Sequence, residues 1–385
     1  MSVTEQIFKA IKSVTGNGNF ALHEPNFEGN ELDYLETCIN TTMVSYLGPF
    51  VDRFEQELAK ATQADYCFST NSGTSALHLA LLAIGIQPND EVLVPALSFV
   101  APANTIRYCQ AIPHFTDINA QTLGVDAKKL NQHLSKITYM NDGVCINKES
   151  QRPIKAIVIM HTFGHPVDIN PLLATARKFN LKVIEDAAEA VGSLYLGHHV
   201  GTFGDIGAFS FNGNKIITTG GGGAVVTNDK ALHEKVKHLG TTAKVSGTFE
   251  FLHDLVGYNY RMPNVNAAIG LAQLEHLDKK VTQKRALTKL YQSALSHING
   301  GQIFIEPSFA QSNYWLQTLT LDNLDKDHRD LLIQKCHKNG LFVRPAWTPL
   351  NHLPPFHNCP KMNLAVTEEF AGRIVNLPSS PTIGK

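Results

Sequence analysis

The sequence predicts an α/β fold, in which a large domain with a mostly parallel sheet is followed by a smaller α+β domain. Between residues 66 and 227, short apolar segments typical of strands alternate with helical segments, as in strand–helix–strand units. From residue 267 the pattern changes to a long helical segment followed by mixed elements. With 385 residues, 43% of them hydrophobic, the chain can form two domains, which we place at residues 1–266 and 267–385.

The large domain is expected to begin with three helices, at residues 2–14, 31–40 and 50–61. In the third, Phe50, Phe54 and Leu58 fall on one face. The alternation then predicts strands at 66–69, 91–94, 111–116, 155–160 and 182–184, and helices at 76–84, 100–108 and 170–179. Residues 135–152 contain an Asn-Asp-Gly turn signal and mixed charge, which indicates an exposed insertion.

A small polar loop, NSGTS at residues 71–75, lies between the first strand and an apolar helix. Such a loop forms an anion site, because unpaired backbone N–H groups and the helix dipole point toward it. The loop lacks the GxxxxGK[ST] spacing of a P-loop, and this disfavours a nucleoside triphosphatase. Ser72 and Ser75 fit an ordinary helix cap equally well.

Acidic residues follow the strand at 182–184, in the sequence EDAAE. Carboxylates there need a cation, and Asp186 is best placed to meet a protonated ring nitrogen. The alternative is a helix N-terminus that carries acidic residues. Phe99, after the strand at 91–94, is either a core residue or stacks on a planar ring, since ligands lie at the carboxyl edge of parallel sheets.

Residues 204–226, GDIGAFSFNGNKIITTGGGGAVV, place Lys215 in surroundings almost free of other charge, since Asp205 is the only other ionisable residue. Alternating apolar residues before the lysine and four glycines after it predict two strands with the lysine on the loop between them. A lone amine in such a setting suits a Schiff-base lysine, because desolvation frees its lone pair for attack on a carbonyl. The alternative is a solvated surface lysine.

The rest of the chain follows a helix expected at residues 230–239. Residues 255–266, LVGYNYRMPNVN, bring aromatic, amide and arginine side chains into one loop. The smaller domain is then predicted from a helix at 267–295, a strand at 315–321, a helix at 327–339 and a strand at 340–345.

Composition and motif spacing argue against nucleic acid, a membrane and a metal ion as partners. The chain has 33 basic and 34 acidic residues, so no field for binding nucleic acid is expected. Six scattered cysteines, no signal peptide and no apolar run long enough to span a membrane indicate a cytoplasmic protein with reduced thiols. We expect no metal site, because Gly164 and Pro166 prevent His161 and His165 from sharing one helical face.

Several ordered motifs give the chain a close resemblance to the DegT/DnrJ/EryC1/StrS family of pyridoxal-phosphate-dependent sugar aminotransferases, which have the aspartate-aminotransferase (type I) fold. They are SYLGPFVDRFEQELA, NSGTSALHLAL, EVLVPALSFVAPANTI, HTFGHPVDI, IEDAAEAVGS, GDIGAFSFNGNKIITTGGGGAVV, GYNYRMPNVNAAIGLAQLE and FVRPAWTPLNHLPPF. Within the family, the GNKIITTGGGG and GHPVDI forms are similar to the branch that aminates the C4 ketone of UDP-linked 2-acetamido-2,6-dideoxy-4-keto sugars.

The resemblance implies a role for each site residue. Lys215 would bind pyridoxal 5′-phosphate as an imine and, once released, move a proton between substrate and cofactor. Asp186 would keep the pyridine nitrogen protonated, Phe99 would stack on the ring, and Glu189 would lie near its substituents, where the family often has glutamine or histidine. The remaining members would hold the phosphate, namely Gly73, Thr74, Ser210 and, from the neighbouring subunit, Asn259. Near the substrate we expect Arg261, Trp347 and His352.

The implied enzyme is a homodimeric nucleotide-sugar aminotransferase that takes its amino group from L-glutamate. Family members that act as dehydratases have histidine at the position of Lys215, so the lysine indicates transamination. A GDP- or dTDP-linked keto sugar, as in perosamine synthesis, is the alternative substrate. A non-catalytic cofactor-binding regulator is a further alternative, which the presence of both Lys215 and Asp186 disfavours.

Overall fold

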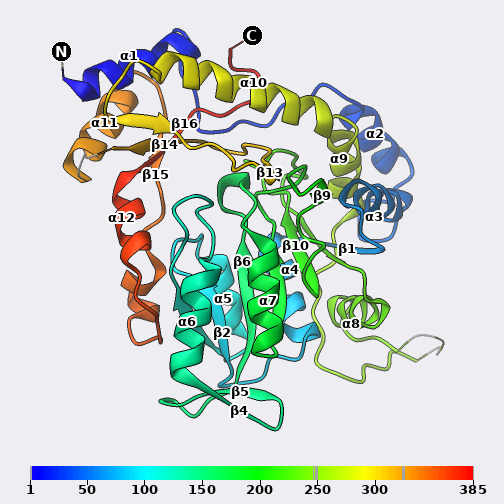
Figure 1. Cartoon of the computed structure of the whole chain (residues 1–385). Coiled ribbons are helices and arrows are strands. Elements are labelled where there is room, and N and C mark those ends of the chain that lie inside the picture. Colours follow the sequence, from blue (N-terminus) through cyan, green and yellow to red (C-terminus); the bar gives the residue numbers. More distant parts are fainter. Residues whose placement is uncertain (1, 246, 248–249, 323–325, 385) are drawn as a thin grey trace.

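The computed structural model describes residues 2–245, 247, 250–322 and 326–384, and a seven-stranded sheet lies at its centre (Figure 1). In spatial order its strands are β1 (Tyr66–Thr70), β11 (Gly223–Thr227), β10 (Ile206–Ser210), β7 (Lys182–Asp186), β6 (Ile154–Met160), β2 (Glu91–Pro95) and β3 (Ile112–Thr116). The last five strands in this order run parallel, and β11 runs antiparallel to both of its neighbours. The predicted α/β class with a mixed, mostly parallel sheet is therefore confirmed.

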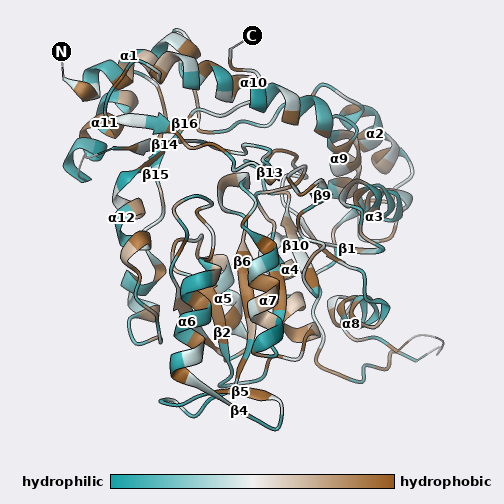
Figure 2. Ribbon diagram, in the orientation of Figure 1, coloured by the Kyte–Doolittle hydropathy of each residue, from teal (hydrophilic) through white to brown (hydrophobic). Residues whose placement is uncertain are grey.

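Helices cover both faces of this sheet, which explains why the middle of most of its strands is apolar on both sides (Figure 2). On one face lie α4 (Gly73–Ala83), α5 (Ala101–Tyr108) and α8 (Lys230–Gly240); on the other lie α6 (Ala127–Ile137) and α7 (Ile169–Lys178). Because successive strand side chains face opposite sides, Val92 and Val94 belong to one buried cluster and Leu93 to another.

A second, antiparallel sheet lies in the C-terminal part. Its strands are β12 (Gly301–Ile303), β14 (Gln317–Leu321), β16 (Ile374–Leu377) and β15 (Arg344–Pro345), accompanied by α11 (Lys326–Lys338) and α12 (Ala365–Arg373). The N-terminal helix α1 (Val3–Thr15) packs here, since Ile7 and Ile11 share a buried cluster with Leu287 and Leu319. The division at residue 266 stays a prediction, and its outer limits, residues 1 and 385, lie outside the described residues.

Two predicted elements of the C-terminal part differ from the structure. The strand expected at residues 340–345 is limited to β15 (Arg344–Pro345). The single helix expected over residues 267–295 is two helices, α9 (Asn264–Leu274) and α10 (Leu277–Leu295). The helices separate where Glu275 accepts hydrogen bonds from Asn30 Nδ2 and Tyr34 Oη, at 2.8 and 2.7 Å. The first packs on α2 (Glu31–Asn40) and α3 (Pro49–Thr62), the second on α1. The sequence contains no glycine or proline at this break, so it carried no local signal for it.

Two smaller sheets complete the description. The insertion expected at residues 135–152 contains a hairpin of β4 (Thr138–Asn141) and β5 (Val144–Asn147). Strands β8 (Leu194–Tyr195), β9 (His198–His199) and β13 (Ala310–Gln311) form the other. Of the helices in the described part of the chain, none has both the length and the apolar character needed to cross a membrane.

Candidate active site

A cavity of about 630 Å³ lies where the carboxyl ends of β2, β6, β7 and β10 face the C-terminal part. This is the edge at which open α/β sheets bind ligands. Eight of the residues predicted for the site line it: Gly73, Thr74, Phe99, Asp186, Glu189, Ser210, Lys215 and Trp347. The cavity therefore joins residues from five separate segments of the sequence.

One end of the cavity is formed by the start of α4. The Ser72 hydroxyl accepts a hydrogen bond from Ser75 N at 3.0 Å, so Ser72 caps the helix, while the N–H groups of Gly73 and Thr74 belong to the turn that has no intrahelical partners. A Cβ atom on Gly73 would lie 2.7 Å from Ser210 Cβ. This close approach of helix and strand makes a cradle for an anion such as a phosphate.

Asp186, at the end of β7, is a buried carboxylate with few partners. Its Oδ1 accepts one hydrogen bond, from Ala188 N at 3.1 Å, and among the described residues no other donor contacts the carboxylate. Burial raises the pKa of Asp186 above its ordinary value, against the opposing effects of that hydrogen bond and of Lys215. A cationic ring N–H would supply the missing donor.

Glu185, the residue before it, faces the opposite side of the sheet and needs no further cation. Its carboxylate accepts hydrogen bonds from His161 Nε2 at 3.0 Å and from the backbone N–H groups of Gly201 and Gly204 at 2.8 and 2.7 Å. Burial alone would raise the pKa of Glu185, but these hydrogen bonds outweigh it and lower the pKa. Of the two adjacent acids, only Asp186 is available to a ligand.

Glu189 and Lys215 meet inside the cavity. Glu189 Oε1 lies 3.4 Å from Lys215 Nζ, and Glu189 Oε2 accepts a hydrogen bond from Phe163 N at 2.8 Å. Burial raises the pKa of Glu189 to about 7, although the charge of Lys215 acts in the opposite direction. Lys215 lies on the loop between β10 and β11 with its side chain 12% exposed, so it is not the solvated lysine of the alternative interpretation.

The wall contributed by the C-terminal part contains residues that the sequence did not indicate. Trp315, Arg344 and Asn376 line the cavity beside the predicted Trp347. Arg344 and Asn376 lie directly opposite each other on β15 and β16. Arg344 belongs to the motif FVRPAWTPLNHLPPF, from which only Trp347 and His352 were predicted as site residues, whereas Trp315 and Asn376 lie outside the quoted motifs. The packing of the small sheet against the loops of the large one brings all three to the site.

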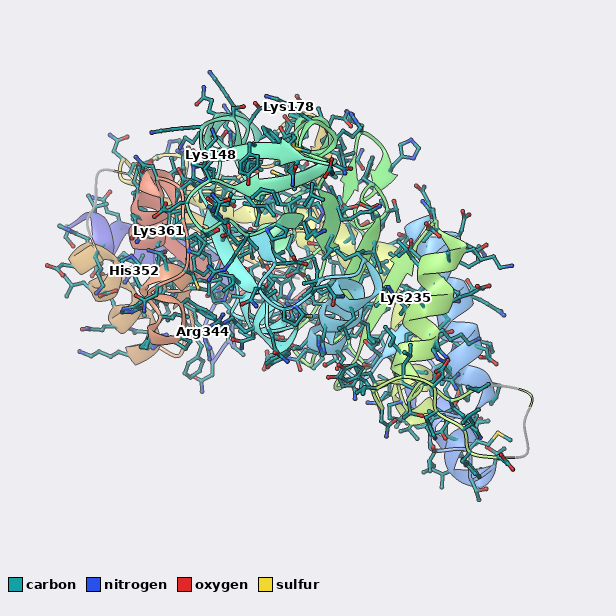
Figure 3. All side chains as sticks on the ribbon, turned by 90° about the horizontal axis from the view of Figure 1, so that it is seen from below. Lys148, Lys178, Lys235, Arg344, His352 and Lys361 are labelled. Carbon is teal, nitrogen blue, oxygen red and sulfur yellow. The ribbon has the colours of Figure 1, made fainter. Side chains whose placement is uncertain are left out.

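Three predicted site residues do not line the cavity of their own chain. Asn259 is exposed, and its carbonyl accepts a hydrogen bond from Asn71 Nδ2 at 3.4 Å. Arg261 lies over the ring of Tyr46 at 5.5 Å. His352 Nε2 donates a hydrogen bond to Glu368 Oε1 at 2.6 Å, and in Figure 3 it lies with Arg344 on the half formed by the C-terminal elements. Their roles stay predictions.

The lining fits pyridoxal phosphate in three respects. A helix N-terminus offers N–H groups to a phosphate, the buried Asp186 carboxylate lacks a donor that a pyridinium would supply, and Lys215 offers an amine to an aldehyde. Phe99, half exposed within the lining, offers an aromatic face to a planar ring.

Comparisons with known proteins agree with this fit. The model of the DegT/DnrJ/EryC1/StrS aminotransferase family matches residues 25–385. The GDP-perosamine synthase of Vibrio cholerae is 38% identical over 361 residues, which cover 94% of each chain. The GDP-perosamine synthase of Caulobacter vibrioides is 37% identical and covers 92% of this chain and 91% of its own length.

Solved structures give the same result. The aminotransferase TlmJ of Streptoalloteichus hindustanus superposes with a TM-score of 0.84 at 26% identity, over 95% of this chain and 94% of that one. Helicobacter pylori PseC, at 24% identity, also has a TM-score of 0.84 over 95% of both chains, and shows the shared fold. Members of the matched family bind pyridoxal phosphate, which is the cofactor that the cavity fits. The chain belongs to the DegT/DnrJ/EryC1/StrS aminotransferase family, and it is an aminotransferase with the type I fold.

Proposed function

We propose that this enzyme transfers the amino group of L-glutamate to the C4 ketone of a GDP-linked 4-keto-6-deoxy sugar. The observation that carries the proposal is the meeting of Lys215, Asp186 and Glu189 in one largely buried cavity beside a helix N-terminus. This set contains an amine, a partner for a ring nitrogen and a site for a phosphate, which together serve amino-group transfer.

Pyridoxal phosphate, when bound, supplies an electron sink for the pair of electrons left on carbon when a proton is removed. Asp186 would hold the proton of the ring nitrogen, and the start of α4 with Ser210 would hold the phosphate. The amine of Lys215, when free, would take a proton from the substrate carbon and return it. Phe99 would cover one face of the ring, and Glu189 would keep the lysine within reach at 3.4 Å.

The nature of the relatives favours a GDP-linked substrate over the UDP-linked one that the motif forms predicted. GDP-perosamine synthases from three bacteria align with more than nine-tenths of this chain at 36–38% identity. We therefore place the GDP-linked sugar, previously the alternative, first. Arg344 and Asn376 on the cavity wall are candidates for contacts with this substrate.

The test is a panel of GDP-, UDP- and dTDP-linked 4-keto-6-deoxy sugars, each incubated with L-glutamate and the cofactor-loaded enzyme. Mass spectrometry of the nucleotide sugar should show conversion of ketone to amine in the GDP series at a kcat/KM at least about 10-fold above the others, a discrimination of about 1.4 kcal/mol. Preference for a UDP-linked 2-acetamido sugar would overturn the choice of nucleotide and leave the aminotransferase assignment intact.

We also propose that a second copy of the chain completes the site. The segment that contains Asn259 and Arg261 does not reach the cavity of its own chain. Exposed apolar residues accompany it: Leu255 and Val256 precede it in sequence and are 58 and 82% exposed, and Leu47, 67% exposed, follows Tyr46, over whose ring Arg261 lies. Apolar surface of this kind is typical of an interface between subunits.

Subunit complementation tests this arrangement. A Lys215→Ala chain mixed with a chain made inactive at Asn259 should regain activity, up to about half per heterodimer, because one intact site remains. Both variants must first be shown to be dimeric and to exchange subunits. Under those conditions, absence of any recovered activity would contradict a shared site.

A further inference from the structure

The amine of Lys215 lies between an aromatic ring and a carboxylate. Its Nζ is 3.7 Å from the centre of the Trp315 ring and 3.4 Å from Glu189 Oε1. The lysine side chain is 12% exposed, and Trp315 and Glu189 are each 4% exposed. An ammonium at this distance from an indole face makes a cation–π contact, which is stronger when the pair is removed from water.

The indole is held in a defined orientation. Trp315 Nε1 donates a hydrogen bond to the carbonyl of Asn214, the residue before Lys215, at 2.7 Å, and Trp315 N donates to Asn313 Oδ1 at 2.7 Å. The ring is therefore fixed at its nitrogen and at its backbone, with one face toward the amine.

The same segment is tied to the loop that carries Glu189. Asn313 is completely buried, and its Nδ2 donates to the carbonyl oxygens of Glu189 and Val191 at 3.0 and 2.8 Å. Asn313 can lie this close to the backbone of residue 164 because that residue is glycine: a Cβ atom on Gly164 would lie 1.9 Å from Asn313 Oδ1. The two partners of the lysine amine are consequently fixed relative to each other.

We propose that Trp315 is a positioning residue whose ring face, together with Glu189, holds the protonated amine of Lys215 whenever that amine is not bonded to the cofactor. The inference rests on the proposed aminotransferase function, in which the free amine accepts one proton and returns one in each half-reaction. The number of protons on the amine is thus restored. A lysine side chain has four rotatable bonds, so without a partner it would sample many orientations and deliver its proton less often.

A direct test needs no turnover. In cofactor-free protein with ¹³C-methylated lysines, the Lys215 signal, identified by its loss in Lys215→Arg, should be shifted upfield by the ring current of Trp315. Trp315→Leu should abolish this shift, and Trp315→Phe should keep part of it. Trp347→Leu is the matched control, because Trp347 is the chain's other tryptophan, lines the same cavity and stacks on Phe163 at 4.8 Å instead.

Kinetics supply a second test. In the half-reaction with L-glutamate, we expect Trp315→Leu to lower kcat about 10-fold and Trp315→Phe to lower it less, with KM changed less than about 2-fold. A raised KM with unchanged kcat would make Trp315 a substrate contact and overturn the proposal. An unshifted Lys215 signal in the unmodified chain would also overturn it, as would an equal loss of kcat in Trp315→Leu and Trp315→Phe. The spectroscopic test uses no sugar. If none of the nucleotide sugars in the panel were aminated, the result for the Lys215 signal would therefore still stand.

Discussion

Two buried carboxylates at opposite ends of the central sheet differ in the number of hydrogen-bond donors that the protein supplies to them. At the amino end of β2, Glu91 is completely buried and accepts hydrogen bonds from His114 Nδ1 at 2.8 Å and from Asn147 Nδ2 at 3.0 Å, with Ser150 as a third donor. At the carboxyl end of β7, Asp186 accepts one.

The pKa shifts follow this difference in donors. Burial alone would raise the pKa of Glu91, but the hydrogen bonds from His114, Ser150 and Asn147 outweigh it and lower the pKa. For Asp186, burial prevails and the pKa is raised. A buried acid with all its donors supplied by the protein stabilises the fold, whereas one that lacks donors is prepared for a ligand. Four substitutions test this contrast.

The largest effect is expected for Lys215→Ala. Removal of the amine should lower turnover about 10⁴-fold, because covalent attachment of the cofactor and proton transfer both depend on it. The visible absorbance of the bound cofactor should be lost in the same variant, while the far-ultraviolet circular dichroism spectrum should be unchanged. Full activity in this variant would refute the assignment of the site.

Asp186→Asn should have the next largest effect. A neutral amide cannot hold a pyridinium proton by charge, so we expect turnover about 10³-fold lower with a folded protein. Steady-state kinetics and thermal unfolding of the variant provide the two measurements. Near-normal kinetics would show that the missing donor at Asp186 has no connection with the cofactor.

Glu189 predicts a pH dependence of stability in the cofactor-free protein. Its pKa is about 7 in the folded state, above the ordinary value of 4.5, so between these values the folded state binds more protons than the unfolded state. The free energy of unfolding should therefore fall as the pH rises from about 4.5 to 7, by at most about 3 kcal/mol from this group. Urea titrations across this pH range should show a smaller fall in the free energy of unfolding for Glu189→Gln than for the unmodified protein. The same dependence on pH in both proteins would contradict the raised pKa of Glu189.

Glu91→Gln should have the smallest effect and should act only on stability. The amide replaces a charged acceptor of three hydrogen bonds, so we expect a loss of about 2 kcal/mol in the free energy of unfolding. Turnover should be unchanged, because Glu91 lies at the end of the sheet away from the cavity. If Glu91→Gln lost activity without losing stability, the proposed contrast between a structural Glu91 and a ligand-binding Asp186 would be wrong.

Local sequence determined much of this protein. Apolar runs bounded by glycine and polar residues were sufficient to predict the strands of the large sheet, because a strand buried on both faces has no polar alternation. Lys215, Asp186 and the loop at residues 71–75 could be predicted as site residues, since each lies where a strand ends and carries chemistry unusual for its surroundings. These signals lie within single segments of about 20 residues.

The tertiary structure alone decided the rest. Trp315 reaches Lys215 only because Asn313 ties its segment to the loop after β7, a contact between residues more than a hundred positions apart in sequence. The break between α9 and α10, where Glu275 meets Asn30 and Tyr34, likewise had no glycine or proline to predict it. The sequence favoured Asp186 over its neighbour Glu185, but only the structure gives the physical reason, because distant loops bring hydrogen-bond donors to Glu185 and leave Asp186 with one. Such contacts depend on how separate elements pack, and local sequence carries no record of that packing.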